Sequence, residues 1–158
     1  MTQRHRLSLF ADYSQFYIED EQANPTADEV GHSWTEETTA DQIAPGRGFI
    51  RFGTVRSTNV PVEIVVEESE PPLDLDAYDH VAEASIAVDS GRLIVAGNSD
   101  AWEDAARLTL EPDTYRARAL YRGLGTLSAD GLDGDDHYTV VLWPAPAAPR
   151  RVLKRYQA

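Results

Sequence analysis

Cysteine is absent from the 158-residue sequence, and only one of its fourteen basic residues, Lys154, is a lysine. The absence of thiols excludes disulfide bonds, thiolate metal sites and cysteine nucleophiles. No stretch approaches the roughly 18 apolar residues that a membrane-spanning helix needs, and the first residues contain no apolar run typical of a signal peptide. We therefore expect a soluble, cytoplasmic protein without membrane contact, with export by an unrecognised route as the alternative.

Basic residues are scarce, and the formal net charge is −13. Residues 7–46 and residues 57–91 contain no lysine or arginine at all. Such a charge repels nucleic acids and anionic membranes, whereas it attracts basic proteins and cations. It also keeps a protein soluble. The composition thus predicts no direct contact with nucleic acid, and it leaves two interpretations of the acidity: solubility or a basic partner.

Recognisable catalytic motifs are missing as well. The sequence has no Gly-x-Ser-x-Gly motif, no phosphate-binding glycine loop and no dinucleotide fingerprint. The histidines His5, His32, His80 and His137 lack the spacing of a transition-metal site. We therefore predict no catalytic residues, no cofactor and no enzymatic activity. An enzyme would need histidines or paired carboxylates that converge in a deep pocket.

Apolar and polar residues alternate with a period of two along most of the chain, as in residues 48–55 and 60–68. This pattern is typical of strands with one buried face. We predict one all-β domain over residues 1–158, an antiparallel β-sandwich of about nine strands without a long helix, with at most a helical turn within residues 34–46. The predicted core comprises Leu7, Leu9, Ile50, Phe52, Val62, Ile64, Val66, Ile86, Val88, Leu93, Val95, Leu108, Leu110, Tyr115, Val140 and Leu142.

The run "LTLEPDTYRARAL" resembles the corner of fibronectin-type and immunoglobulin-like sandwiches, where a tyrosine ring packs inside and its hydroxyl bonds a nearby backbone group. Tyr115 takes that position here. If Tyr115 points inward, Arg116, Arg118 and Arg122 point outward. We expect them on a solvent face, paired with acids of neighbouring strands. The alternative is an anion-binding stripe.

The acidic loop "SADGLDGDDHY" concentrates Asp130, Asp133, Asp135 and Asp136 beside His137. Clustered carboxylates and glycines are what a Ca²⁺ site requires, but the spacing does not match an EF-hand loop. Gly and Asp are also the usual residues of hairpin loops. We predict an acidic loop without a metal. The alternative function for the chain is a Ca²⁺-dependent, carbohydrate-binding or other ligand-binding module that uses these four aspartates.

A large aromatic side chain, Trp34, lies in an acid-rich region with Glu36, Glu37 and Asp41. Trp is enriched where proteins bind one another, although it can also close the core of its own chain. Binding residues concentrate in loops, where strand pairing does not neutralise acids. We therefore predict that Trp34, Glu36, Glu37 and Asp41 contact a basic partner, with the four aspartates of residues 130–136 as the second choice.

Several segments, taken together, resemble the competence protein J family of DNA-entry nuclease inhibitors. They are "DYSQFYIED", Trp34, "GRGFIRFGTV", "SGRLIV", "EPDTYRARALYRG" and "HYTVVLWPA", in this order over about residues 7–153. The resemblance implies a small, acidic, non-enzymatic protein that binds and restrains a nuclease. It transfers no site residue to this chain.

Overall fold

The computed structural model describes residues 2–157. The strands are β1 (Gln3–Phe10), β2 (Gln15–Asp20), β3 (Ile43–Gly46), β4 (Phe49–Gly53), β5 (Asn59–Val66), β6 (His80–Val88), β7 (Arg92–Gly97), β8 (Ala106–Thr109), β9 (Asp113–Arg122), β10 (His137–Pro144) and β11 (Arg151–Lys154). The helices are α1 (Ala27–Ser33) and α2 (Glu36–Asp41), and the short 3₁₀ turns are η1 (Asp12–Ser14), η2 (Leu75–Ala77) and η3 (Trp102–Asp104).

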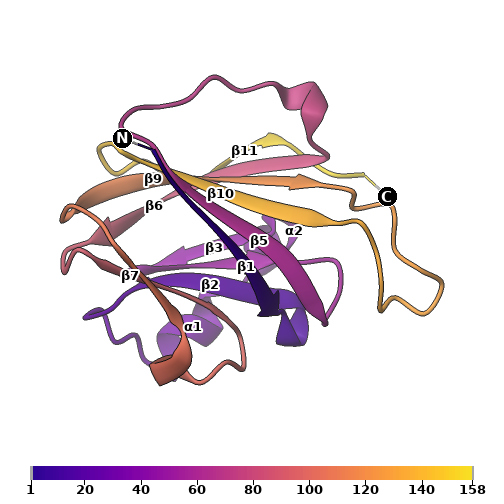
Figure 1. Ribbon diagram of the computed structural model, residues 1–158, viewed down its shortest axis with the longest axis horizontal. Helices are drawn as coiled ribbons and strands as arrows, with labels where there is room; N and C mark the ends of the chain where they lie inside the picture. The colour runs from indigo at the N-terminus through magenta and orange to yellow at the C-terminus, as the bar shows by residue number, and fades with distance from the viewer. Residues whose placement is uncertain (1, 158) are drawn as a thin grey trace.

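The strands form two sheets. The six-stranded sheet has the order β1-β5-β10-β9-β6-β11, and the five-stranded sheet has the order β3-β4-β2-β7-β8. Figure 1 shows the larger sheet curling over the smaller one. The prediction of a β-rich chain without a long helix is confirmed. The prediction of about nine strands, all antiparallel, is wrong, because the described residues form eleven strands and β5 runs parallel to β10.

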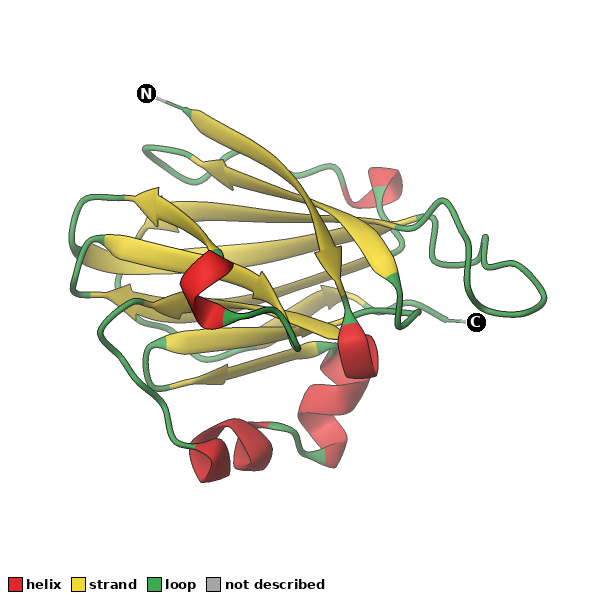
Figure 2. Ribbon diagram, turned by 60° about the horizontal axis from the view of Figure 1, so that its bottom comes forward, coloured by secondary structure: helices red, strands yellow, loops and turns green. Residues whose placement is uncertain are grey.

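The two α-helices lie together beyond one edge of the five-stranded sheet (Figure 2), and both contact the edge strand β3. Each begins with a capping box, built by Thr26 with Glu29 and by Thr35 with Thr38. These reciprocal bonds satisfy backbone N–H groups that a short helix leaves free. The helices thereby cover an edge that would otherwise expose unpaired backbone groups.

The core lies between the two sheets, where the inward-facing side chains of both gather into one cluster. All the predicted core residues belong to it except Leu7, which is half-buried and packs against its margin. Aromatic rings fill its centre, with Phe16 stacked on Phe52 at a centroid distance of 5.0 Å and Tyr121 edge-on to Tyr138 at 4.7 Å. The period-two pattern thus identified the buried faces correctly.

The predicted tyrosine corner is present. The side chain of Tyr115 is buried in the core, and its hydroxyl donates a hydrogen bond of 2.6 Å to the backbone oxygen of Glu111. The bond ties the start of β9 to the turn that precedes it.

The arginines of β9 differ from the prediction. Arg116 and Arg118 do pair with an acid on a neighbouring strand, at 3.2 Å and 2.8 Å from the carboxylate of Glu83 on β6. However, they are 6% and 2% exposed, so their expected place on a solvent face is wrong. Two segments cover them: Arg116 donates to the backbone oxygens of residues 148 and 149, and Arg118 donates to that of residue 71. Only Arg122, at the end of β9, is exposed as predicted.

Candidate partner-binding site

A hollow of about 450 Å³ opens where the chain passes from β1 to β2, between η1, the α1–α2 junction and the end of β4. Trp34 forms one wall. Its indole N–H donates a hydrogen bond of 3.0 Å to the side-chain oxygen of Gln15, which fixes the ring half-buried at the surface. Gln42 and Val55 line the hollow as well. Its lining contains hydroxyl, amide and apolar groups but no acid or imidazole, which suits binding better than acid–base chemistry.

Tyr13 stands at the mouth of this hollow and is 77% exposed. It adopts a left-handed conformation with φ 56°, and the next residue, Ser14, follows with φ 55°. Such conformations are strained for residues with a side chain and persist only where neighbours enforce them. Here the turn is held by bonds from Ser14 N–H to the Ala11 oxygen and from Thr54 N–H to the Ser14 oxygen. The fold therefore holds a large aromatic ring in water on a rigid turn.

The acids Glu36 and Glu37 occupy the first turn of α2, directly after Trp34 and Thr35. Both are exposed, and neither makes an ion pair with any residue from 2 to 157 that the structure describes. Negative charge is favoured in this position by the helix dipole. The expectation that these acids lie in a loop is wrong, because both lie on α2. The hollow itself brings Trp34 together with Tyr13, which the sequence analysis did not single out, and the two acids follow Trp34 along the chain.

Asp41 is placed differently from its predicted neighbours. It is 8% exposed and pairs with Arg150 at 2.7 Å and Arg155 at 2.6 Å. Burial opposes its ionisation, but the hydrogen bonds from the two arginines outweigh burial and hold the pKa of Asp41 below its usual value. Its charge is therefore used within the chain, where it ties the end of α2 to the C-terminal segment.

The same junction contains a buried histidine, His80. Its Nε2 lies 2.7 Å from the backbone oxygen of Asp41, and its Nδ1 accepts a hydrogen bond of 3.1 Å from Tyr156 N–H. These partners require the neutral ring with its proton on Nε2, because a proton on Nδ1 would face another donor. Burial accordingly lowers the pKa of His80.

We expect the free energy of unfolding to fall as the pH drops below about 6.5, the ordinary pKa of histidine. A lowered folded-state pKa contributes stability above that value, and the contribution is lost as the pH falls through the folded-state pKa. Urea unfolding of the His80→Gln variant between neutral and mildly acidic pH should show a smaller decline than the parent. The matched control is His32→Gln, since His32 is exposed on α1. If the unfolding free energy of His80→Gln declined as steeply as that of the parent, another group would cause the pH dependence, for example His137, whose pKa is also lowered by burial.

The acidic loop of residues 128–137 does not bring its four aspartates together. Asp136 is buried and pairs with Arg56 at 2.8 Å, and its other oxygen accepts a hydrogen bond of 2.7 Å from the hydroxyl of Tyr138. Asp130 accepts bonds from within its own loop, whereas Asp133 and Asp135 are exposed. Across residues 2–157, no group of three or more histidine or acidic side chains is placed to hold a metal ion.

No helix within residues 2–157 combines the length and apolar character that crossing a membrane requires. No protein-family model matches the sequence. No curated protein matches it either.

Solved structures do match. ComJ from Bacillus subtilis, described as an inhibitor of the DNA-degrading activity of NucA, superposes with a TM-score of 0.64 at 16% identity, covering 90% of this chain and 96% of ComJ. The chain has a ComJ-like fold. The product of crocagin biosynthetic gene J matches with a TM-score of 0.63 at 17% identity, covering 92% of this chain and 99% of the other. The family resemblance predicted from the sequence is therefore confirmed at the level of the ComJ-like fold.

Proposed function

We propose that this protein is a non-enzymatic inhibitor that binds a nuclease and acts in the cytoplasm. The observation that carries the proposal is the ComJ-like fold, because ComJ itself inhibits a DNA-degrading activity. The charge of the chain supports it. A nuclease presents a basic surface to DNA, and a protein with a net charge of −13 can occupy that surface by charge complementarity.

The surface around Tyr13, Trp34, Glu36 and Glu37 is the best candidate for this contact. The turn fixes the backbone of Tyr13, and a hydrogen bond fixes the ring of Trp34, so both can contact a partner at a reduced cost in conformational entropy. The two acids beside them have no partner of their own among the described residues. Rigid aromatic anchors with a charged rim are typical of the energetic centre of an interface.

The proposal is tested by affinity capture of a nuclease from the source lysate, followed by a DNA-degradation assay with increasing amounts of this protein. We expect the captured nuclease to lose activity in proportion to the complex formed. A nuclease that binds but degrades DNA at its full rate would contradict the inhibitor function.

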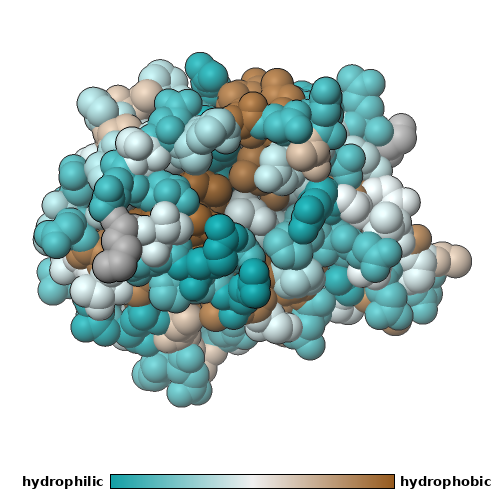
Figure 3. Space-filling view, turned by 45° about the horizontal axis from the view of Figure 1, so that its top comes forward, coloured by the Kyte–Doolittle hydropathy of each residue, from teal (hydrophilic) through white to brown (hydrophobic). Residues whose placement is uncertain are grey.

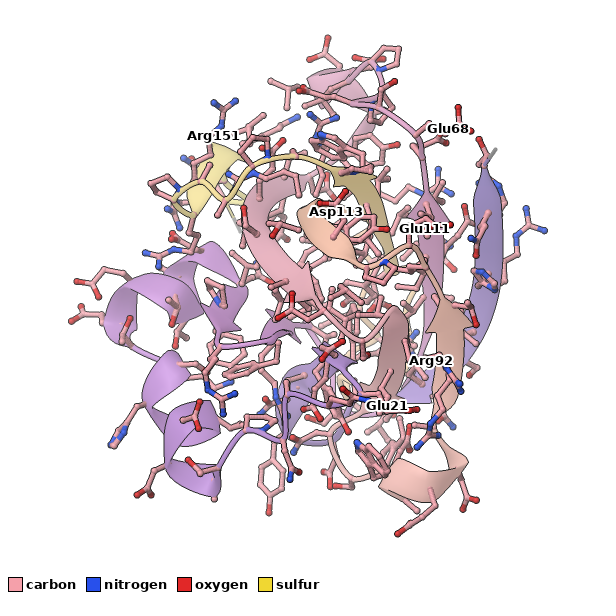
Figure 4. The ribbon with its side chains drawn as sticks, turned by 90° about the vertical axis from the view of Figure 1, so that its left-hand side faces the viewer. Glu21, Glu68, Arg92, Glu111, Asp113 and Arg151 are labelled. Atoms are coloured by element: carbon pink, nitrogen blue, oxygen red, sulfur yellow. The ribbon has the colours of Figure 1, made fainter. Side chains whose placement is uncertain are left out.

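Charge reversal of Glu36 and Glu37 to lysine is expected to slow association with that nuclease about tenfold at low salt and to weaken the salt dependence, because rim charges mainly steer encounter. The measurement is binding kinetics at low and high salt. The matched control reverses Glu111 and Asp113, which are exposed at the turn into β9, at the end of the molecule that faces the viewer in Figure 4. Equal slowing in both variants would point to net charge alone and against this surface.

Replacing Tyr13 with asparagine is expected to weaken binding by about 2 kcal/mol, the lower bound for an energetically central interface residue. Asparagine tolerates the left-handed backbone, so the turn should persist while the ring is removed. Isothermal titration with the captured nuclease measures the loss, and the unfolding free energy serves as the control for folding. Unchanged affinity in a folded variant would exclude Tyr13 as an anchor.

A further inference from the structure

The outer face of the six-stranded sheet carries a groove of about 470 Å³, lined by side chains of β1, β5, β9 and β10 and by the segment of residues 67–79. Most of its open surface is polar, but a small apolar strip lies at its base, formed by Val65, Leu120 and Val141, which are 5–7% exposed. Val65 on β5 stands opposite Val141 on β10, and Leu120 on β9 stands opposite the neighbouring Thr139. Figure 3 shows this face, with hydrophobic side chains gathered in its middle between hydrophilic ones.

The rim of the groove is basic, although the protein as a whole is acidic. Arg4 and Arg6 project from β1 and share one carboxylate, that of Glu63, which lies 3.1 Å from Arg6 Nε. Glu67 lines the groove as well, so the two arginines of β1 face two carboxylates there, and the positive excess of the rim depends on Arg122. Both arginines remain largely exposed, with 52% and 79% of their side-chain surface open to water.

Arg122 and His137 close the groove on the opposite side, and Arg122 carries the positive charge there. Arg122 at the end of β9 stands directly across from His137 at the start of β10. Arg122 is exposed and makes no ion pair within the described part of the chain. Burial lowers the pKa of His137, and the nearby positive charge of Arg122 lowers it further. Glu63 and Asp136 act on this pKa in the opposite direction, so Arg122 together with the exposed arginines of β1 is what favours an anion here.

We propose that this groove binds an acidic polypeptide segment, with carboxylates at Arg6 and Arg122 and an apolar side chain on Val65, Leu120 and Val141. Charge complementarity identifies the sign of the ligand. The small apolar strip at the base of the groove favours a peptide over a phosphate or a bare carboxylate, because only a peptide brings an apolar side chain to it. Nucleic acid is disfavoured, since its long charged backbone would meet the net charge of −13 outside the groove. The site is separate from the Tyr13 surface and opposite to it in charge.

The test uses a short synthetic peptide of alternating glutamate and leucine residues, titrated at low salt against the ¹⁵N-labelled full chain. We expect amide shifts along β1, β9 and β10, and a rise in the pKa of His137 when the peptide's carboxylates arrive. The double variant Arg6→Glu/Arg122→Glu should weaken binding at least about tenfold, because attraction becomes repulsion. The control is Arg92→Glu/Arg151→Glu, which makes the same charge change at residues outside the groove that are labelled in Figure 4.

Three further probes separate the alternatives. A peptide with serine in place of leucine should bind more weakly, whereas equal binding would remove the apolar strip from the proposal. Inorganic phosphate or a single-stranded oligonucleotide that binds as tightly as the peptide would overturn the choice of a polypeptide. Amide shifts on β1, β9 and β10 that depend on protein concentration without peptide would assign the groove to a second copy of this chain. Absence of peptide binding, or equal loss in the control variant, would overturn the site itself.

Discussion

Replacing Glu83 with glutamine is expected to lower the free energy of unfolding by about 3–5 kcal/mol, the cost of leaving buried charges without their partner. The carboxylate of Glu83 lies within 3.2 Å of Arg116 and 2.8 Å of Arg118, and all three side chains are less than 10% exposed. Glutamine keeps the size of the side chain but removes its charge. Urea denaturation of both proteins at neutral pH measures the difference.

Glu70 supplies a matched control for this prediction. It pairs with the same Arg118 at 2.9 Å, but 65% of its side chain is exposed. Because water screens an exposed pair, Glu70→Gln should cost no more than about 1 kcal/mol. Similar losses in the two variants would mean that burial does not decide the strength of this pair, contrary to our interpretation of the arginine cluster.

The second large effect is expected for Asp136→Asn, which should cost about 3–5 kcal/mol because it leaves the buried guanidinium of Arg56 without a counter-charge. The loss of stability should be the same with calcium and with a chelator, because both carboxylate oxygens of Asp136 already accept hydrogen bonds, from Arg56 and Tyr138. Thermal melts under both conditions measure this. Asp133→Asn is the control, because Asp133 is an exposed member of the same loop.

A rise in the melting temperature of the parent protein on addition of calcium would indicate that it binds the ion, because a bound ion stabilises the folded state by mass action. If that rise disappeared in Asp133→Asn, the loop would be a calcium site, and the ligand-binding alternative would replace the inhibitor as the function to pursue. We expect no such rise, because Asp130 and Asp136 bond different groups and Asp133 and Asp135 are exposed.

Features encoded by neighbouring residues were predictable from the sequence. Alternation identified the buried faces, since side chains of a strand point alternately to its two sides. The short run around Tyr115 identified the corner, because the tyrosine and its backbone acceptor are four positions apart. Glu36 and Glu37 are exposed, although on a helix and not in the loop expected for them, and Trp34 is half-buried. Their role in binding stays a prediction.

Features that depend on distant segments were not predictable. Arg116 and Arg118 show the alternation of a solvent face, yet residues 67–79 and 144–150 fold over them. Asp41 is neutralised by Arg150 and Arg155, which lie more than a hundred positions away along the chain. Tyr13 gave no signal, because its exposure depends on a left-handed turn that local composition does not reveal. Each of these outcomes depends on which segments meet in space.

The parallel pairing of β5 with β10 delays folding of the larger sheet during translation. β5 is synthesised early, but its inner neighbour β10 emerges only after β6, β7, β8 and β9 have followed. Until then one edge of the β1–β5 pair stays open, with apolar side chains beside unpaired backbone groups. Such long-range pairing is slow and leaves the nascent chain prone to aggregation. The larger sheet should therefore close after translation, and the growing chain should be a substrate for holding chaperones until β10 arrives.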